Sequence, residues 1–240
     1  MFCVAQEGNA IIPQPFDGVE YVDYVGKRSD AKPCCMDPHT PPPVASHSFH
    51  AAPSQPVVLV LASGRGARFA ESGGSVYKLR ALLHGLPVLE HTLAAVRASG
   101  LPWHLEDAGH PGMGDSIAAA VRATAGAPGW LVLPGDLPLI QPDTLRTMAA
   151  ALTDCAVAVP VLQGERGHPV AFTAECLAGL LALTGEQGAA SVVRMQAQRG
   201  AVRCVEVSDV GVVTDVDTVS DLERAERLLV QRQPRPKNRI

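Results

Sequence analysis

Leu59-Val60-Leu61-Ala62-Ser63-Gly64-Arg65-Gly66-Ala67-Arg68 is the stretch that decides the fold of this chain. An apolar run from Val57 to Leu61 ends abruptly there in a loop of small residues with two arginines. A run of this length bounded by glycine predicts a buried strand. The glycines let the main chain approach a ligand closely because they lack side chains. The arginines favour an anion, above all a phosphate, which a guanidinium can hold through paired hydrogen bonds.

This loop differs from the two most common phosphate-binding motifs. No Gly-Lys-Ser or Gly-Lys-Thr follows it, so the sequence does not predict a P-loop ATPase. Gly64 and Gly66 are not followed by a third glycine at the step that the dinucleotide-binding fingerprint requires. The loop therefore indicates a nucleotide enzyme of another kind.

The composition bounds the classes of protein that remain. With 240 residues, 47% of them hydrophobic and 18% charged, the chain can form one sizeable core with an appendage. Its net charge of -4 argues against a broad nucleic-acid surface. No apolar stretch is long enough to cross a membrane, and the N-terminus lacks a basic region followed by an apolar one. We expect a cytoplasmic protein with small-molecule partners, and neither a nucleic acid nor a membrane among its partners.

The six cysteines form no regular framework. Cys34 and Cys35 lie near His39, but adjacent cysteines lack the usual spacing of a metal site. A buried thiol is expected for Cys155, Cys176 and Cys204, which lie in apolar or periodic segments.

The chain changes in character near residue 56. Residues 1–55 contain a triple proline and little periodicity, which predicts a flexible extension, although an overlong gene start would look the same. Residues 56–230 form the predicted catalytic domain, and residues 231–240 a polar tail. Within the domain, strands are expected over 57–62, 101–105, 130–134, 156–162, 170–172 and 202–207. Helices are expected over 87–99, 115–124, 142–152, 174–183, 189–198 and 218–230. This alternation predicts a mainly parallel, Rossmann-like α/β sheet flanked by helices.

Two groups of residues are candidates for phosphate binding. Arg68 and Lys78 can neutralise a triphosphate and stabilise a departing pyrophosphate, although Lys78 can also be an ordinary surface lysine. Gly112, Gly114 and Ser116 precede or open a helix, where main-chain N–H groups can bind an anion, or where a helix simply begins.

Three aspartates are candidates for metal binding. Asp136 follows the apolar strand 130–134, where a carboxylate needs a partner, and magnesium is a natural one. A structural turn is the alternative. Strand-like alternation places Asp215 and Asp217 on one side and Val216 on the other, so one aspartate can complete the site with Asp136. Alternatively, Asp217 caps the helix that follows.

A further group, Gly167-His168-Pro169, forms a predicted tight turn before a strand. His168 can contact the second substrate there, although a lone histidine is more often a structural residue.

Six segments taken in order resemble the MobA-like nucleotidyltransferase family, most closely its molybdenum cofactor cytidylyltransferase branch. They are Leu61–Arg68 with Lys78, Gly112–Ser116, Gly135–Pro138, Gly167–Pro169, Gly188-Ala189 and Asp215–Leu222. The resemblance covers about residues 57–230. It implies a fold of the nucleotide-diphospho-sugar transferase type. It also implies transfer of a nucleotidyl group from a nucleoside triphosphate, with CTP favoured, and release of pyrophosphate. The implied acceptor is the molybdenum cofactor, a molybdopterin-type molecule that a molybdoenzyme would then receive.

The resemblance also assigns roles to residues of this chain. The nucleotide would be held by Leu61, Ala62, Ser63, Gly64, Gly66, Arg68, Lys78, Gly112, Gly114 and Ser116. Arg68, Lys78 and Asp136 would carry the catalysis. Asp136 would bind Mg²⁺ together with Asp215 or Asp217, and Gly167, His168 and Pro169 would contact the acceptor.

The sequence departs from the family pattern at several places. Ser63 replaces an alanine, Glu71–Ser75 lengthen the interval between Arg68 and Lys78, and Gly185–Ala190 lacks an arginine. The segment 100–111 has room for one strand where the family has a strand, a helix and a second strand. Two alternatives therefore stay open: a sugar-phosphate or polyol-phosphate acceptor, and a nucleotide-binding relative without activity.

Overall fold

A computed structural model describes residues 54–64 and 66–232. The predicted extension lies outside the described residues except for Ser54 and Gln55, and so do Cys3, Cys34, Cys35 and His39. Of the predicted tail, only Gln231 and Arg232 are described, and they continue the last helix.

The centre of the fold is a seven-stranded sheet. Its strands are β1 (Val57–Leu61), β4 (Trp103–Glu106), β5 (Gly129–Pro134), β6 (Val157–Leu162), β7 (Glu165–Arg166), β8 (Val170–Thr173) and β9 (Val202–Glu206). The order is β4-β1-β5-β8-β6-β7, and β9 also pairs with β6. β1 is parallel to β4 and β5, and β6 to β9, whereas β8 is antiparallel to both β5 and β6. Five strands thus share one direction, which confirms the mainly parallel sheet.

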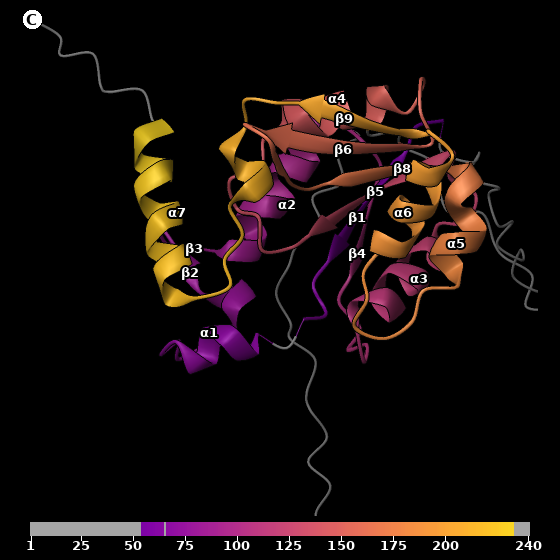
Figure 1. The fold of residues 1–240 in the computed structure, drawn as a ribbon. Helices are drawn as coiled ribbons and strands as arrows, with labels where there is room; N and C mark the ends of the chain where they lie inside the picture. Colours follow the sequence, from indigo (N-terminus) through magenta and orange to yellow (C-terminus); the bar gives the residue numbers. More distant parts are fainter. Residues whose placement is uncertain (1–53, 65, 233–240) are drawn as a thin grey trace, which may run out of the picture. The chain divides into compact units, whose positions relative to one another are not determined.

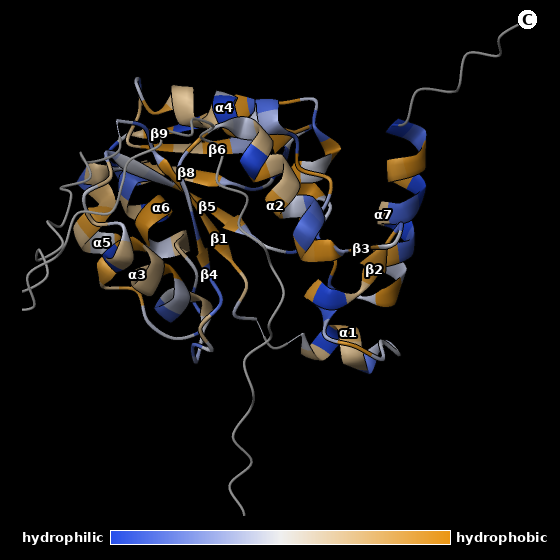
Figure 2. Ribbon diagram, turned by 180° about the vertical axis from the view of Figure 1, so that it is seen from behind, coloured by the Kyte–Doolittle hydropathy of each residue, from blue (hydrophilic) through white to orange (hydrophobic). Residues whose placement is uncertain are grey.

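Helices cover both faces of this sheet (Figure 1). On one face lie α2 (Val88–Ser99) and α4 (Pro142–Ala151). On the other lie α3 (Met113–Ala123), α5 (Leu177–Leu181) and α6 (Ala190–Gln198). Because alternate residues of a strand face opposite sides, Leu59 of β1 packs in the cluster beneath α3, α5 and α6, and Val60 in the cluster beneath α2 and α4. The continuous apolar colour of β1 and β5 in Figure 2 reflects burial on both faces.

A third apolar cluster joins short elements beside the sheet. These are α1 (Ala67–Glu71), the hairpin of β2 (Leu82–Leu83) and β3 (Leu86–Pro87), and α7 (Val219–Arg232). Short 3₁₀ turns lie at Lys78–Arg80, Ala174–Cys176 and Val210–Val213. The main side chains of this cluster are buried, among them Phe69, Leu83, Val216 and Ala225.

A capping box of Thr218 and Asp221 opens α7. The Thr218 hydroxyl donates to Asp221 Oδ2 at 2.7 Å, and the Asp221 N–H donates back to Thr218 Oγ1 at 3.2 Å. Thr218 N–H also donates to Asp221 Oδ2 at 2.8 Å. The cap uses Asp221, and the Asp217 side chain bonds elsewhere, as described below.

Other expectations need correction. α3 begins at Met113, two residues before the predicted start. Asp115 therefore lies within the first turn of the helix, where its side chain accepts a hydrogen bond from Gly185 N–H. The predicted helix over 174–183 divides into a 3₁₀ turn and α5. Cys176 is buried as expected. Cys155 is only half-buried, and Cys204 is exposed on β9, which among the described strands pairs with β6 alone.

The segment 100–111 contains one strand, as its length predicts. Among the strands of residues 54–64 and 66–232, β4 pairs with β1 alone and stands at the end of the strand order. Across the described part of the chain, no helix has the length and apolar character needed to cross a membrane.

Candidate active site

The loops after β1 and β5 meet at one edge of the sheet because these strands are parallel and adjacent. Gly135 N–H donates to Leu61 O at 2.9 Å, and the buried Thr92 hydroxyl of α2 donates to Gly135 O at 3.0 Å. These bonds fix the turn that presents Asp136. The chain after β9 reaches the same place, where Val216 N–H donates to Asp136 O at 3.0 Å.

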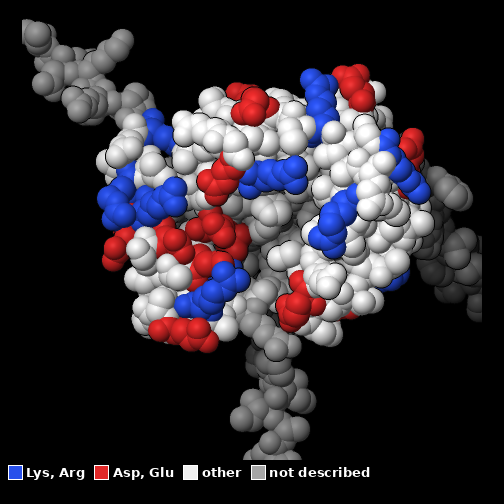
Figure 3. Space-filling view, in the orientation of Figure 1, with Lys and Arg blue, Asp and Glu red and all other residues white. Residues whose placement is uncertain are grey.

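A cleft of about 740 Å³ opens along this edge. Most of the predicted site residues line it: Leu61, Ser63, Gly64, Gly66, Arg68, Lys78, Gly112, Ser116, Asp136, Gly167, His168, Asp215 and Asp217. Three do not, namely Ala62, Gly114 and Pro169. Figure 3 shows acidic and basic side chains side by side at the rim of a hollow, on the side where α1 and α7 lie.

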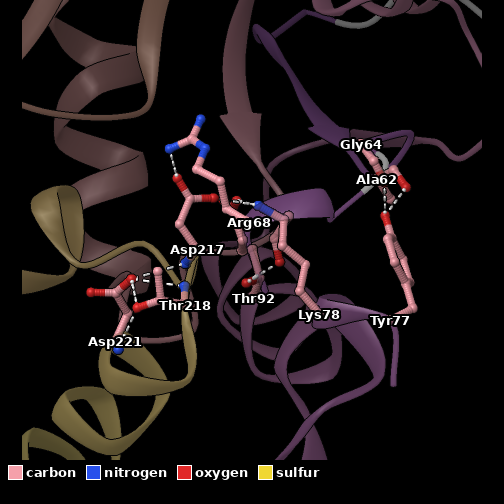
Figure 4. A network of polar contacts seen from close by, with 11 residues as sticks. Ala62, Gly64, Arg68, Tyr77, Lys78, Thr92, Asp217, Thr218 and Asp221 are labelled. Carbon is pink, nitrogen blue, oxygen red and sulfur yellow. Dashed lines mark hydrogen bonds and ion pairs between the residues drawn. The ribbon is translucent and has the colours of Figure 1, made fainter. Parts of the chain in front are cut away.

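Four charged side chains of the cleft form one network, in which Lys78 and Arg68 pair with Asp136 and Asp217 (Figure 4). Lys78 Nζ lies 2.6 Å from Asp136 Oδ2 and 2.7 Å from Asp217 Oδ1. Arg68 Nη1 lies 2.5 Å from Asp217 Oδ2. Only 13% of the Lys78 side chain is exposed, against 76% for Arg68, so Lys78 is the anchored cation and Arg68 the outer one.

Burial and charge act in opposite directions on this network. Burial disfavours the ammonium of Lys78, but Asp136 and then Asp217 hold its pKa above the usual range. Burial likewise opposes ionisation of Asp217, yet Lys78 and then Arg68 hold its pKa below the usual range. Both groups are therefore charged near neutral pH. Lys78 is not the ordinary surface lysine of the alternative interpretation.

Asp136 and Asp215 have oxygens suited to a divalent cation. Asp136 Oδ1 is buried without a hydrogen-bond partner in the part of the chain that the structure describes. Desolvation, and then the charges of Asp136 and Asp217, raise the pKa of Asp215, as expected for carboxylates that crowd one another. Within residues 54–64 and 66–232, no group of three or more histidine, cysteine, aspartate or glutamate side chains could hold a metal. A divalent cation such as Mg²⁺ can bind through one or two carboxylates and complete its shell with water and phosphate oxygens.

The glycines at the start of α3 pack closely against another loop. A Cβ on Gly112 would lie 2.2 Å from the main chain of Gly185, and one on Gly114 would lie 2.8 Å from Gln187 O. Gly114 N–H already donates to Gly185 O at 2.8 Å, and the Ser116 hydroxyl donates to Gly112 O at 3.1 Å. Gly112 and Ser116 still line the cleft, so their predicted contact with a nucleotide stays a prediction.

His168 lies at the cleft beside the aspartates. Gly167 packs so closely on Val212 that a Cβ would lie 2.3 Å from Val212 O, and His168 N–H donates to the same oxygen at 2.9 Å. Burial lowers the pKa of His168 despite the nearby charges of Asp136 and Asp215, so the imidazole is neutral. Its buried Nδ1 has no hydrogen-bond partner among the described residues.

Three further cleft or near-cleft residues escaped the sequence analysis. Tyr77 bonds to the loop after β1. Glu106 is buried at the end of β4, where its Oε1 lies 3.0 Å from Nε2 of the cleft residue His110. Glu106 is a charge at the end of a strand, the same signal that identified Asp136. An aromatic residue directly before Lys78 in a chain with 4% aromatics was the available signal for Tyr77.

Comparisons with known proteins place this geometry among nucleotide enzymes. Residues 58–207 match the MobA-like NTP transferase domain. Among curated proteins, none matches the chain at the level of similarity that we required.

Solved structures share the fold at low sequence identity. A nucleotidyl transferase from Methanothermobacter thermautotroptrophicus (Mth528) is 24% identical with a TM-score of 0.63, over 75% of this chain and 100% of that one. Rv0371c from Mycobacterium tuberculosis, in complex with manganese, is 23% identical with a TM-score of 0.58, over 72% and 99%. Molybdopterin-guanine dinucleotide biosynthesis protein A from Archaeoglobus fulgidus is 17% identical with a TM-score of 0.51, over 73% and 99%.

Proposed function

Because the chain belongs to the MobA-like NTP transferase domain family, we propose that it transfers CMP from CTP to the phosphate of a molybdopterin-type acceptor and releases pyrophosphate. The family and the fold support a nucleotidyltransferase. The choice of CTP and of the molybdenum cofactor rests on the form of the motifs Gly112–Ser116, Gly167–Pro169 and Asp215–Thr218. A molybdoenzyme would then receive the product, in the cytoplasm.

One observation carries the proposal. Arg68, Lys78, Asp136 and Asp217, which come from segments far apart in the sequence, converge on one side of a single cleft. The inserted residues Glu71–Ser75 do not displace Lys78. Ser72 of the insertion bonds to α1 and to the start of α7. Its hydroxyl donates to Phe69 O at 2.9 Å and accepts from Val219 N–H at 3.0 Å.

The reaction follows from this arrangement. An oxygen of the acceptor phosphate attacks the α-phosphorus of CTP, and the bond from that phosphorus to the bridging oxygen of the β-phosphate breaks, so that pyrophosphate leaves. Lys78 and Arg68 would exchange their carboxylate partners for phosphate oxygens and stabilise the charge that builds on the leaving group. The enzyme contributes positioning and charge neutralisation, without a covalent intermediate.

Asp136 and Asp215 are the residues that would hold Mg²⁺, with Asp217 nearby as the partner of the two cations. When bound, the metal ion neutralises phosphate charge and orients the phosphate oxygens. The neutral His168 would offer Nδ1 to the acceptor, beside Gly167 and Pro169.

The test is release of pyrophosphate from each nucleoside triphosphate, with Mg²⁺ and molybdenum cofactor. We expect release with CTP, and at least a hundredfold less from Asp136→Asn, in line with the loss of a preorganised charged group. Asp154→Asn, a carboxylate that pairs with Arg203 on the surface, is the matched control and should retain activity. No release with any nucleotide would refute the proposal. Release only with a sugar phosphate or polyol phosphate would replace the acceptor.

A further inference from the structure

Tyr77 links two parts of the proposed phosphate-binding region, the loop after β1 and Lys78. It directly precedes Lys78, and its hydroxyl points back to the loop after β1 (Figure 4). The hydroxyl lies 2.6 Å from Gly64 O and 3.1 Å from Ala62 O. A phenol has one proton to donate, so the bond to Gly64 is the principal one and Ala62 shares it.

The ring of Tyr77 also contacts this loop. Gly66 has a φ of +64°, and a Cβ there would lie 3.3 Å from Cδ2 of Tyr77. The side chain of Tyr77 therefore bonds to the loop at Ala62 and Gly64 and fills the space beside Gly66, while Lys78 carries the ion pairs with Asp136 and Asp217.

These bonds orient the peptide groups of the loop. In a trans peptide the carbonyl and the following N–H point in opposite directions. Because Ala62 O faces Tyr77, the N–H of Ser63 points away from it, and Ser63 lines the cleft. Main-chain N–H groups directed into a cleft are donors to phosphate oxygens.

We infer that Tyr77 is a positioning residue, which holds the peptides from Ala62 to Gly64 in the orientation that receives the triphosphate. The inference rests on the proposed function and adds to it a residue outside the motifs that suggested that function. Tyr77 belongs to this chain's lengthened interval between Arg68 and Lys78. The last residue of this interval is therefore the one that bonds to the loop after β1.

Tyr77→Phe tests this, because it keeps the ring against Gly66 and removes only the hydroxyl. Ser99→Ala is the matched control: it removes a hydroxyl that donates to Val96 O at 2.6 Å, in a residue that does not line the cleft. Two readouts are needed on the full chain. The first is hydrogen exchange, without ligand, of the Ala62 amide, whose N–H donates to Glu106 O at 2.8 Å at the start of this loop. The second is the Kd of MgCTP, and of inorganic tripolyphosphate with Mg²⁺, by calorimetry.

We expect Tyr77→Phe to exchange the Ala62 amide about fivefold faster and to bind both probes about five- to tenfold more weakly, as for loss of one net hydrogen bond. Ser99→Ala should change neither, even if both variants lose similar thermal stability. Unchanged exchange, or unchanged Kd for both probes, would overturn the inference. If the wild-type protein binds neither probe, the proposed function fails, and exchange alone then decides whether Tyr77 holds the loop.

Discussion

At the scale of single residues, the three aspartates Asp136, Asp215 and Asp217 outnumber Arg68 and Lys78, the two cations that pair with them. Asp136 and Asp217 share Lys78, and Arg68 adds a second bond to Asp217. Asp215 has no such partner among the cations of the network, and burial, followed by the neighbouring carboxylates, raises its pKa. This imbalance is what a divalent cation would relieve.

We therefore predict that Asp215→Asn raises the melting temperature in metal-free buffer at pH 7 while it weakens binding of Mg²⁺. A carboxyl whose pKa is raised in the folded state disfavours folding at pH values above its ordinary pKa of 3.8. Below that pH the group is protonated in both states, so the gain should disappear there. Thermal unfolding from pH 3 to 8, with calorimetry of Mg²⁺, measures both effects. A lower melting temperature for the variant at pH 7 would contradict the prediction.

At the scale of elements, the start of α7 depends on its capping box. Thr218→Ala removes the hydroxyl that bonds Asp221 and should lower the free energy of unfolding by about 1 kcal/mol. Because Asp217 directly precedes this cap, we also expect weaker binding of MgCTP. Urea unfolding measures the first effect. Thr153→Ala, which removes an exposed hydroxyl bonded to Ala150 O, is the control. Equal stability of the two variants would argue against the cap.

The contact between α3 and the loop at Gly185 is a second feature of this scale. Gly112→Ala places a methyl group 2.2 Å from Gly185 main-chain atoms, which must move. We expect a loss of about 1–3 kcal/mol of stability, typical of overpacking. Gly109→Ala is the matched change, because nothing lies within 4 Å of its Cβ position. If Gly112→Ala unfolds at the same urea concentration as Gly109→Ala, α3 and this loop do not pack as closely as described.

At the scale of the whole molecule, the cleft draws on segments from Leu61 to Asp217, so a ligand bound there should stabilise the entire domain. We predict that CTP with Mg²⁺ raises the melting temperature, and CTP with a chelator much less. A ligand at 100 times its Kd adds about 2.7 kcal/mol to the stability of the native state. GTP is the comparison nucleotide. A larger shift with GTP than with CTP would reverse the proposed donor.

The sequence by itself determined the features that depend on local pattern. The apolar runs specify β1 and β5, because a strand buried on both faces needs a continuous apolar segment. Thr218 and Asp221 specify the cap, because its bonds span three residues. The order of strands and helices specifies the sheet class and places Arg68, Lys78, Asp136 and Asp217 at chain positions next to one edge.

Only the tertiary structure decided which of these groups pair. Lys78 bonds to Asp136 and Asp217, which lie 58 and 139 residues away, and no local pattern encodes such distances. The same holds for the interval between Arg68 and Lys78: Tyr77 bonds to Gly64 O, and the inserted Ser72 bonds to Val219 N–H. Gly112 and Gly114 likewise meet the loop at Gly185 only after α3 and α5 have packed on the sheet. Such contacts depend on how distant elements pack, whereas the pattern of neighbouring residues fixes only the elements themselves.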